Sequence, residues 1–329
     1  APVVSNVPGS MDATLECPDT GALAAALAFE PSATDDCTQP PAPVLTADDI
    51  VGAGCSYLRT RTWTFTDLCG NASTFTQMIT VVPVVKVSMR VLLEGPYEEA
   101  TERMKDDLRF DGLLPVEQPY SVAPFNYVGN ETASPTLFTA SDPDNAIVDW
   151  VLIELRDETT PTLIVARCAA LVQRDGDVVD MNGGSDVSLI NVADGSYHVV
   201  VRHRNHLGVM TASPLALSAA PTSVDFTSTA FMTYGSDAIK TIGTRRVLWA
   251  GNALHDKRIR YTGSDNDRDL VLVRIGGIVP TNVVFNVYAT EDVNLDSDVK
   301  YTGPFNDRDP ILVNIGGTVP TAQRFEQLP

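Results

Sequence analysis

The stretch RTRTWTFTDLCGNASTFTQMITVV, residues 59–82, decides the fold of the N-terminal part of the chain. Trp63 and Phe65 alternate with Thr and Arg, and a second alternating run follows after a short interruption. Alternation of apolar and polar side chains over this length is typical of strands with one buried face. The interruption at residues 67–71 contains Asp, Gly and Asn, which favour a tight turn. The sequence therefore predicts a hairpin with strands from Tyr57 to Thr66 and from Ser73 to Val82.

The cysteines are unevenly distributed, because four of the five precede residue 70. Four cysteines in one small β-rich segment favour two disulfides and an oxidising compartment. A zinc site is the alternative, but no Cys-x-x-Cys pair occurs and no histidine lies nearby. The four residues are Cys17, Cys37, Cys55 and Cys69. Pairing of Cys17 with Cys69 and of Cys37 with Cys55 is one arrangement, and the other pairings stay open.

The fifth cysteine, Cys168, lies in the apolar run LIVARCAAL at residues 163–171. A cysteine in such a run behaves as a small apolar side chain. We therefore expect Cys168 to be a buried free thiol.

The first region, residues 1–84, resembles HYR-like domains. The resemblance rests on the hairpin and on LECPDTGALAAALAFEPSATDDC at residues 15–37. These domains are immunoglobulin-like β-sandwiches that are repeated in bacterial surface proteins and known for adhesion. The resemblance implies a structural spacer or an adhesive module and no catalysis.

The second region, residues 85–230, reads as another β-sandwich, because short alternating segments are separated by Gly, Asp, Asn and Pro turns. Residues 193–218, ADGSYHVVVRHRNHLGVMTASPLALS, resemble a hairpin of prealbumin-like sandwiches. We expect a short helix at Glu98–Leu108. The expected strands are Lys86–Glu94, Ile147–Leu155, Leu163–Gln173, Ser196–Arg204 and Leu215–Ser218.

The third region, residues 247–329, follows a linker at 231–246 and contains an internal repeat. YTGSDNDRDLVLVRIGGIVPT at 261–281 recurs as YTGPFNDRDPILVNIGGTVPT at 301–321. A duplicated unit of this length predicts a pseudo-symmetric pair in which each copy covers the apolar face of the other.

A candidate calcium loop, DVNLDSDV, precedes the second copy at residues 292–299. Oxygen-bearing side chains at alternate positions gather around one point, as calcium with its six to eight oxygen ligands requires. We expect side-chain ligands from Asp292, Asn294 and Asp296 and a backbone carbonyl from Asp298. A downstream carboxylate closes such a loop, and the two candidates are Asp307 and Asp309.

The first copy has fewer oxygen ligands, since Leu254 stands where the second copy has Asn294. We expect its site to be weaker or empty. The alternative for either loop is a turn rich in Asp and Asn that binds no metal. The candidate ligands of the first copy are Asn252, Asp256, Asp267 and Asp269.

The paired loops resemble dockerin repeats, in which a calcium loop precedes a helix. Dockerins fold on binding calcium and dock onto a cohesin partner. Here the insertion YTGPFN departs from the usual twelve-residue loop.

A further resemblance covers several segments, DDLRFDGLLP, DWVLIELRD, ALVQRDGDVVD and EQLP. They resemble the C-terminal part of large secreted surface proteins of bacteria that use type IX secretion.

Composition narrows the classes of partner. The net charge of −19 disfavours nucleic acid and anionic membrane surfaces. No apolar run approaches the ~20 residues that span a bilayer. Because the chain opens with Ala-Pro, we expect a processed product or a piece of a longer protein. The resemblance to the C-terminal part of large secreted surface proteins implies an internal start at Ala1 and a natural end at Pro329.

Catalysis finds little support in the sequence. Asp175 and Asp177 in RDGDVVD are best read as a turn, although an acid–base pair is the alternative. His203 and His206 can approach each other at a turn. Two packed histidines are the simpler expectation there, and a metal site is the alternative. No motif for a nucleophile elbow, a zinc protease or a phosphate loop occurs.

We therefore predict a mainly β, non-enzymatic, extracellular or cell-surface protein with a structural or adhesive role and bound Ca²⁺. Its partner is a protein, bound through the dockerin-like module or by self-association at sheet edges. A filament joined by Ala1–Val7 as an added strand is one version. The alternatives are the tail of a larger secreted enzyme and a glycan-binding module that uses Trp150 and Tyr197.

Overall fold

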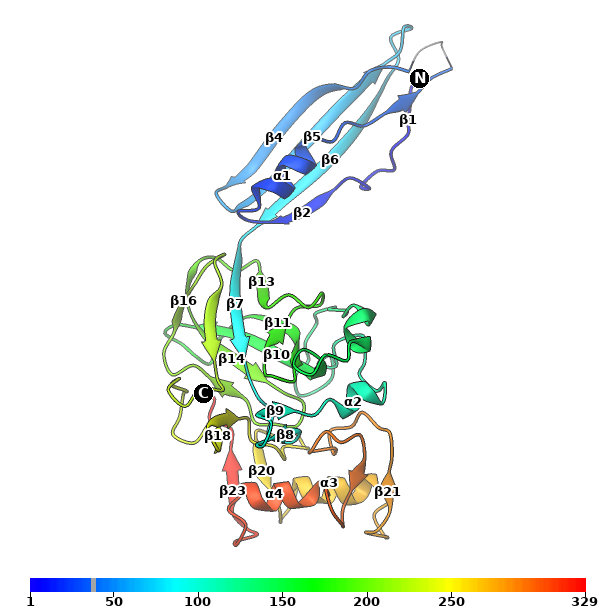
Figure 1. Ribbon diagram of the computed structural model, residues 1–329. Coiled ribbons are helices and arrows are strands. Elements are labelled where there is room, and N and C mark those ends of the chain that lie inside the picture. Colours follow the sequence, from blue (N-terminus) through cyan, green and yellow to red (C-terminus); the bar gives the residue numbers. More distant parts are fainter. Residues whose placement is uncertain (37–39) are drawn as a thin grey trace. The chain divides into compact units, whose positions relative to one another are not determined.

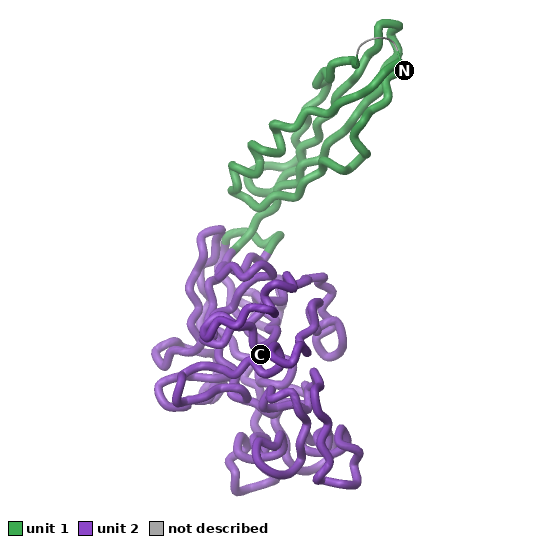
Figure 2. The backbone as a smooth tube through the Cα atoms, turned by 45° about the vertical axis from the view of Figure 1, so that its right-hand side comes forward, with its two compact units in different colours: residues 1–85, 190–194 green, residues 86–189, 195–329 purple. Residues whose placement is uncertain are grey.

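The computed structural model describes residues 1–36 and 40–329. The chain divides into two compact units, shown in Figure 2. Unit 1 contains Ala1–Val85 with Ile190–Asp194, and unit 2 contains Lys86–Leu189 with Gly195–Pro329. Strands far outnumber helices in both units, which confirms the prediction of a mainly β protein (Figure 1).

Unit 1 is built on a four-stranded sheet with the order β2-β6-β5-β4. The predicted hairpin is confirmed, since β5 and β6 pair antiparallel with Trp63 opposite Phe75. The first strand, β2, joins β6 in parallel, and β4 is an edge strand. The bounds are β2 Ala13–Glu16, β4 Val44–Ala53, β5 Ser56–Thr66 and β6 Ala72–Val82.

The core of unit 1 lies on one face of this sheet. Trp63, Phe65 and Phe75 are buried there because the alternation points them to the same side, and Phe29 packs against them. Asp19 caps helix α1 (Thr20–Leu27) by accepting a hydrogen bond from the Ala22 N–H at 2.8 Å. A separate pair of short strands is formed by β1 (Val3–Val4) and β3 (Ala33–Thr34).

Unit 2 contains a central sheet with the order β12-β11-β10-β14-β15, and β16 also pairs with β14. Its middle strand β10 is buried from Ile147 to Arg156, so both of its faces are covered. One cover is the segment around Tyr120, whose hydroxyl donates to the Trp150 carbonyl at 2.7 Å. The bounds are β10 Ile147–Asp157, β11 Ile164–Gln173, β12 Val178–Val179, β14 Gly195–Arg202, β15 Val209–Met210 and β16 Leu215–Leu217.

A three-stranded sheet has the order β13-β7-β17, with β13 at Asp186–Ile190, β7 at Val84–Arg90 and β17 at Thr222–Asp225. Val87 and Met89 of β7 are buried while Lys86, Ser88 and Arg90 are half-buried, as the sequence alternation requires. The strand expected at Lys86–Glu94 is therefore confirmed as β7, although β7 begins at Val84 and ends before Glu94. The other four expected strands of this region correspond to β10, β11, β14 and β16.

The helix expected at Glu98–Leu108 is wrong over most of its length. Tyr97–Glu98 (β8) pairs with Arg103–Met104 (β9), and the turn between them holds Glu102 at φ 54°, which a helix does not allow. Only α2 (Asp107–Phe110) is helical in this part. A 3₁₀ turn, η1, follows at Pro135–Thr139.

The segment expected to be a linker, residues 231–246, contains most of a hairpin formed by β18 (Lys240–Ile242) and β19 (Arg245–Val247). Lys240 forms an ion pair with Glu94, and its ammonium also lies 5.2 Å from the ring centre of Trp249. The segment is thus packed within unit 2.

The repeat forms an intertwined pair of copies at the C-terminal end of unit 2 (Figure 1). The first copy runs β20-α3-β21 and the second runs β22-α4-β23. The first strand of each copy pairs with the last strand of the other, β20 with β23 and β21 with β22. The bounds are β20 Arg258–Arg260, α3 Asp267–Arg274, β21 Val283–Val284, β22 Val299–Lys300, α4 Arg308–Asn314 and β23 Gln323–Phe325.

This exchange of strands gives the two copies one common core. Val271 and Ile275 of the first copy and Ile311 and Ile315 of the second are buried in a single cluster, together with Trp249. Each copy therefore covers the apolar face of the other, as the internal repeat predicted.

Candidate functional site

The second repeat loop has a tightly turned backbone. Leu295 and Ser297 have φ values of 57° and 71°, in the left-handed region that lets a short loop curl around its own side chains. Asp292 is fully buried at the start of this loop. Its two carboxylate oxygens accept hydrogen bonds from the backbone N–H groups of Asp296 and Ser297, both at 3.1 Å.

Asp307 closes the second loop from the start of α4. Its Oδ1 accepts from the Val293 N–H at 2.7 Å, and its Oδ2 accepts from the Lys300 N–H at 2.8 Å. Burial raises the pKa of Asp307 to about 7. Burial and the nearby Asp307 carboxylate raise the pKa of Asp292 well above its ordinary value.

The remaining oxygen-bearing side chains of the loop contact one another and one cation. The Asn294 amide donates to Asp296 Oδ2 at 3.0 Å. The Lys300 ammonium lies 3.3 Å from Asp296 Oδ2 and 3.0 Å from Asp298 Oδ2. The lysine pairs with Asp296 and Asp298 only, and the carboxyl groups of Asp292 and Asp307 accept backbone N–H groups, so the loop gathers more acidic groups than the lysine neutralises.

Asp309, the other candidate for closing the loop, lies in the first turn of α4. Its N–H donates to the Asn306 side chain at 2.9 Å, and Arg308 pairs with its carboxylate at 2.7 Å. Asp269 repeats this arrangement with Asn266 in the first copy. Both side chains are about half exposed, 54% for Asp309 and 52% for Asp269. Asn306 and Asn266 thus cap the N–H groups of Asp309 and Asp269, and each Asp carboxylate accepts in return from the amide of the same asparagine.

The first loop repeats the backbone of the second. His255 and Lys257 have φ values of 58° and 67°, at the positions of Leu295 and Ser297. Asp267 accepts from the N–H groups of Leu254 at 2.9 Å and of Arg260 at 2.8 Å, as Asp307 does in the second loop. Burial raises the pKa of Asp267 to about 7.

The charges of the first loop differ from those of the second. The Arg258 guanidinium pairs with Asp256 at 2.5 Å, and Asn252 stands where the second loop has the buried Asp292. Among the described residues, Asn252 Oδ1 and Asp256 Oδ1 have no hydrogen-bond partner. The first loop therefore offers a cation fewer carboxylates, and an arginine already balances one of them.

The calcium prediction can be compared with this geometry. Within residues 1–36 and 40–329, no group of three or more His, Cys, Asp or Glu side chains is arranged to hold a metal ion. In the second loop the carboxylate oxygens are occupied by backbone N–H groups and by Lys300. The donor set still fits calcium in kind, since it offers carboxylate, amide and carbonyl oxygens within one loop.

A buried polar network, which the sequence did not reveal, joins the central sheet to the segment before the second loop. The Asn205 amide donates to the carbonyls of Thr290 at 3.2 Å and Asp292 at 2.6 Å. Arg204 donates to the Ala289 carbonyl and, at 2.8 Å, to Asp149. The network holds residues 289–292 against the sheet. Its only signal in the sequence is the presence of charged residues in an otherwise apolar run such as DWVLIELRD.

Asp149 is the centre of this network. It is fully buried and accepts hydrogen bonds from Arg204, from His203 at 3.1 Å and from the Tyr288 hydroxyl at 2.7 Å. Burial opposes its ionisation, but Arg204 and His203 hold the pKa of Asp149 well below its ordinary value. His206 approaches His203 to 3.0 Å, as expected from the sequence. The two histidines are packed within the network.

The other candidate sites lie in structural positions. Gly176 between Asp175 and Asp177 has φ 95°, and the Asp177 N–H donates to Asp175, as in a turn. Trp150 is fully buried and its indole N–H donates to the Pro115 carbonyl at 2.9 Å, so its ring is not open to a sugar. Tyr197 lies in β14 of the central sheet.

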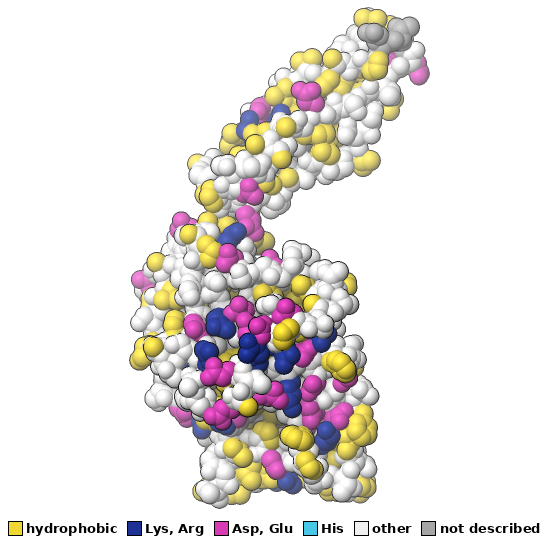
Figure 3. Space-filling model, viewed as in Figure 1, with side chains coloured by type: hydrophobic (Ala, Val, Ile, Leu, Met, Phe, Trp, Pro, Cys, Tyr) yellow, Lys and Arg dark blue, Asp and Glu magenta, His cyan; other side chains and the backbone are white. Residues whose placement is uncertain are grey.

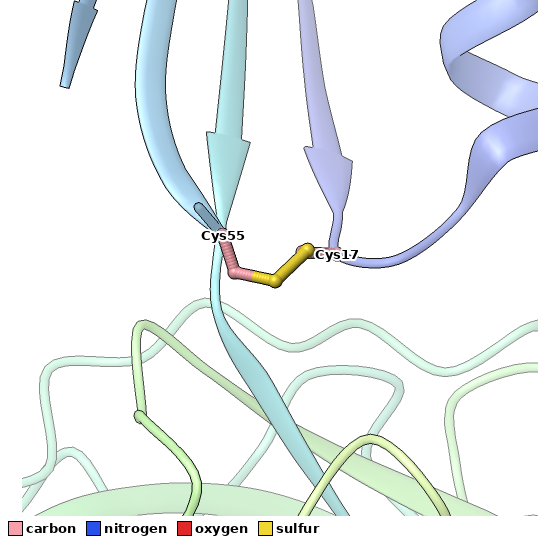
Figure 4. The surroundings of a disulfide bond; sticks show 2 residues. All are labelled: Cys17 and Cys55. Atoms are coloured by element: carbon pink, nitrogen blue, oxygen red, sulfur yellow. A yellow bond between two sulfur atoms is a disulfide. The ribbon is translucent and has the colours of Figure 1, made fainter. Parts of the chain in front are cut away.

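A disulfide joins Cys17 and Cys55 in unit 1 (Figure 4). The arrangement of Cys17 with Cys69 and Cys37 with Cys55 is therefore wrong, because β2 and the β4–β5 turn place Cys17 beside Cys55. Cys69 is an exposed free thiol, and Cys37 lies outside the described residues. Cys168 is buried and free, as predicted.

Acidic and basic side chains are interspersed over the face of unit 2 seen in Figure 3. None of the helices described is long and apolar enough to cross a membrane.

Comparison with known proteins identifies one family. The chain matches no curated protein and no solved structure. Residues 5–81 match the family described as "HYR-like domain with 4 cysteines". Unit 1 has the β-rich fold and a cysteine pair that this family implies. The first region is thus similar to HYR-like domains, which are non-enzymatic, immunoglobulin-like and typical of extracellular proteins.

Proposed function

We propose that this chain is a structural or adhesive protein of the bacterial cell surface whose C-terminal repeat is stabilised by calcium and docks a protein partner. The HYR-like first region supports an extracellular, adhesion-type role. The Cys17–Cys55 disulfide agrees with an oxidising compartment.

The observation that carries the calcium part is the concentration of carboxylates in the second loop. Asp292 and Asp307 are buried there, and Asp296 and Asp298 share Lys300. Buried carboxylates without matched cations are costly, and a divalent ion that takes oxygen ligands relieves that cost. We assign the ion to Asp292, Asn294 and Asp296, with the Asp298 carbonyl and with Asp307 as the closing residue.

Calcium is expected to stabilise unit 2 against thermal unfolding. Calcium at a hundredfold excess over its dissociation constant adds about 2.7 kcal/mol to a folded state that alone binds it. For a unit of this size, that raises the melting temperature by about 5–11 °C. Thermal unfolding of the full chain in calcium and in EDTA, at constant ionic strength, measures this shift.

Two variants make the experiment specific. Asp292→Asn removes a buried carboxylate of the loop and is expected to abolish the calcium shift. Asp309→Asn alters a carboxylate at the same helix start that accepts from Asn306 and Arg308, so its shift is expected to match that of the unaltered chain. Equal melting temperatures in calcium and EDTA for the unaltered chain contradict the proposal.

Docking of a partner is supported by exposed apolar side chains on the repeat. Surface patches of large apolar side chains commonly mark protein interaction sites. The side chains of Val273 and Val313 occupy equivalent positions of α3 and α4 and are 67% and 58% exposed. Further exposed large apolar side chains of the repeat are Ile278, Phe285, Phe305, Val319 and Phe325.

Self-association is the version of this proposal that unit 1 supports. The N-terminal segment expected to add to a neighbour is already paired, since β1 joins β3 and the Pro2 carbonyl accepts from Ser73. One edge of the four-stranded sheet is β4, on which Ile50 and Val51 are 55% and 74% exposed. Sedimentation over a wide concentration range is expected to show association that Val51→Pro weakens, and a monomer throughout contradicts it.

A further inference from the structure

A cavity of about 120 Å³ lies in unit 2 between two loops that the calcium proposal does not use. Val122 and Phe125 line it from one loop, and Tyr288 and Thr290 line it from the segment that leads into the second repeat loop. Arg204 completes the wall from the end of β14. The cavity thus lies where the central sheet meets the repeat.

Arg204, which lines this cavity, has an unused hydrogen-bond donor. The residue is 4% exposed, its Nε donates to Asp149 at 2.8 Å and its Nη1 donates to the Ala289 carbonyl. Its Nη2 has no hydrogen-bond partner in the part of the chain that the structure describes. Because buried donors in folded proteins are almost always paired, an acceptor atom from outside the chain is expected here.

His255 brings a second unused polar atom from the first repeat loop. It lines the same cavity, and its Nδ1 has no partner among the described residues. Its ring packs edge-on against Phe125, with the ring centres 5.7 Å apart.

The charges around the cavity favour a neutral occupant. The positive charge of Arg204 is already balanced by the buried carboxylate of Asp149, which lies 2.8 Å from its Nε. A buried anion would therefore lack a counter-charge of its own. A neutral carbonyl oxygen satisfies the free N–H without adding charge.

The rest of the lining is apolar or aromatic. Pro119, Val122, Ala123 and Phe125 form one side of the cavity, and Tyr288 forms the other, with the Arg204 guanidinium 4.3 Å from its ring centre. Such walls suit a methyl group or a flat amide plane. A cavity of about 150 Å³ holds a benzene molecule, so this one has room for about that many atoms or slightly fewer.

We propose that this cavity binds an acetamido group, with its carbonyl oxygen on Arg204 Nη2, its N–H toward His255 Nδ1 and its methyl group against Phe125 and Val122. N-acetylated sugars and N-acetylated peptide ends share this chemistry. The inference goes beyond the proposed function and requires neither calcium binding nor a docking partner.

Saturation-transfer NMR on the full chain tests the proposal with small probes. N-acetylglucosamine and N-acetylglycinamide are the sugar and peptide arms, and glucose and acetate are their matched controls. The acetyl methyl protons of at least one arm are expected to receive the strongest saturation, with a dissociation constant on the order of 1 mM. Glucose and acetate are expected to receive none. Acetate that binds as well as the acetamides, or acetamides that receive no saturation, overturns the proposal.

Rim variants locate the binding without disturbing the buried network. Val122 is 66% exposed at the cavity, so Val122→Trp is expected to fold and to fill the entrance. Val128 is 93% exposed on the same loop and does not line the cavity, so Val128→Trp is the matched control. Val122→Trp is expected to weaken acetamide binding at least about tenfold, and Val128→Trp to leave it unchanged. Equal binding by the two variants places the probe elsewhere and refutes the assignment.

Discussion

His206 provides a test of the buried network that joins the central sheet to the repeat. It is buried, its Nε2 accepts from the Gly95 N–H at 3.1 Å, and its Nδ1 lies 2.8 Å from Asn205 Oδ1. Since Nε2 accepts, the hydrogen-bond network assigns the single proton of the ring to Nδ1. His203 donates from its own Nε2 to Asp149, which leaves its Nδ1 free to accept from His206. Both rings are therefore neutral in the folded state.

The pH dependence follows from this assignment. Burial, with the nearby charge of Arg204, lowers the pKa of His206 well below the ordinary value of 6.5. Below pH 6.5 the unfolded chain takes up a proton that the folded chain refuses, so the free energy of unfolding falls as the pH falls. One such histidine contributes a slope of up to about 1.4 kcal/mol per pH unit. Above pH 6.5 it contributes none.

The variant His206→Gln isolates this contribution. The glutamine amide can accept from Gly95 and donate to Asn205, but it does not titrate. Since His203, Asp149 and Arg204 are present in both proteins, their titration largely cancels in the difference. We expect the unaltered chain to lose up to about 1.4 kcal/mol more per pH unit below 6.5 than the variant does.

Urea unfolding between pH 7.5 and 5 measures the two slopes. The change Trp63→Phe in both proteins confines tryptophan fluorescence to Trp150 and Trp249 of unit 2. Calcium is kept at one saturating concentration in both proteins, so that the contribution of the repeat loops cancels in the difference between them. Parallel pH profiles for the two proteins refute a neutral, buried His206.

Two further predictions concern cross-links within each unit. The double change Cys17→Ser with Cys55→Ser removes the cross-link between two residues 38 positions apart. It is expected to lower the free energy of unfolding of unit 1 by about 4 kcal/mol, measured in urea by Trp63 fluorescence. A loss below about 1 kcal/mol contradicts the bridge. In unit 2, Asn314→Ala removes a buried amide that donates to Glu94 and to a backbone carbonyl. This variant is expected to lower the free energy of unfolding by about 2–4 kcal/mol. Arg274→Ala, at the equivalent and exposed position of the first copy, is expected to lower it by less than about 0.5 kcal/mol. Similar costs for the two variants would show that the second copy is not held to the rest of unit 2 through Asn314.

Local patterns in the sequence predicted much of the fold. The alternation around Trp63 predicted β5 and β6, because a slip of one residue would move Trp63, Phe65 or Phe75 from the buried face to the opposite face. The repeat at 261–281 and 301–321 predicted a pair of copies that share a core. The helix expected at Glu98–Leu108 is wrong, because the charged residues of this segment are as compatible with a turn as with the surface of a helix. Glu102 adopts the left-handed backbone conformation there.

The candidate site was less predictable, because its partners are distant in sequence. Asp149, His203 and Tyr288 meet only after β10, β14 and the repeat have packed together. Spacing alone did not distinguish Asp307 from Asp309. The structure distinguishes them, since Asp307 accepts N–H groups of the loop and Asp309 pairs with Asn306 and Arg308. The second of the two disulfides expected from the four N-terminal cysteines stays a prediction.

The central claim is that a calcium ion occupies the second repeat loop, and a crystal structure of the chain grown with calcium tests it most directly. The account predicts an ion about 2.3–2.6 Å from oxygens of Asp292, Asn294 and Asp296, with the Lys300 ammonium withdrawn from Asp296. A loop in which that ammonium still bridges Asp296 and Asp298, with no ion among these oxygens at saturating calcium, would contradict it.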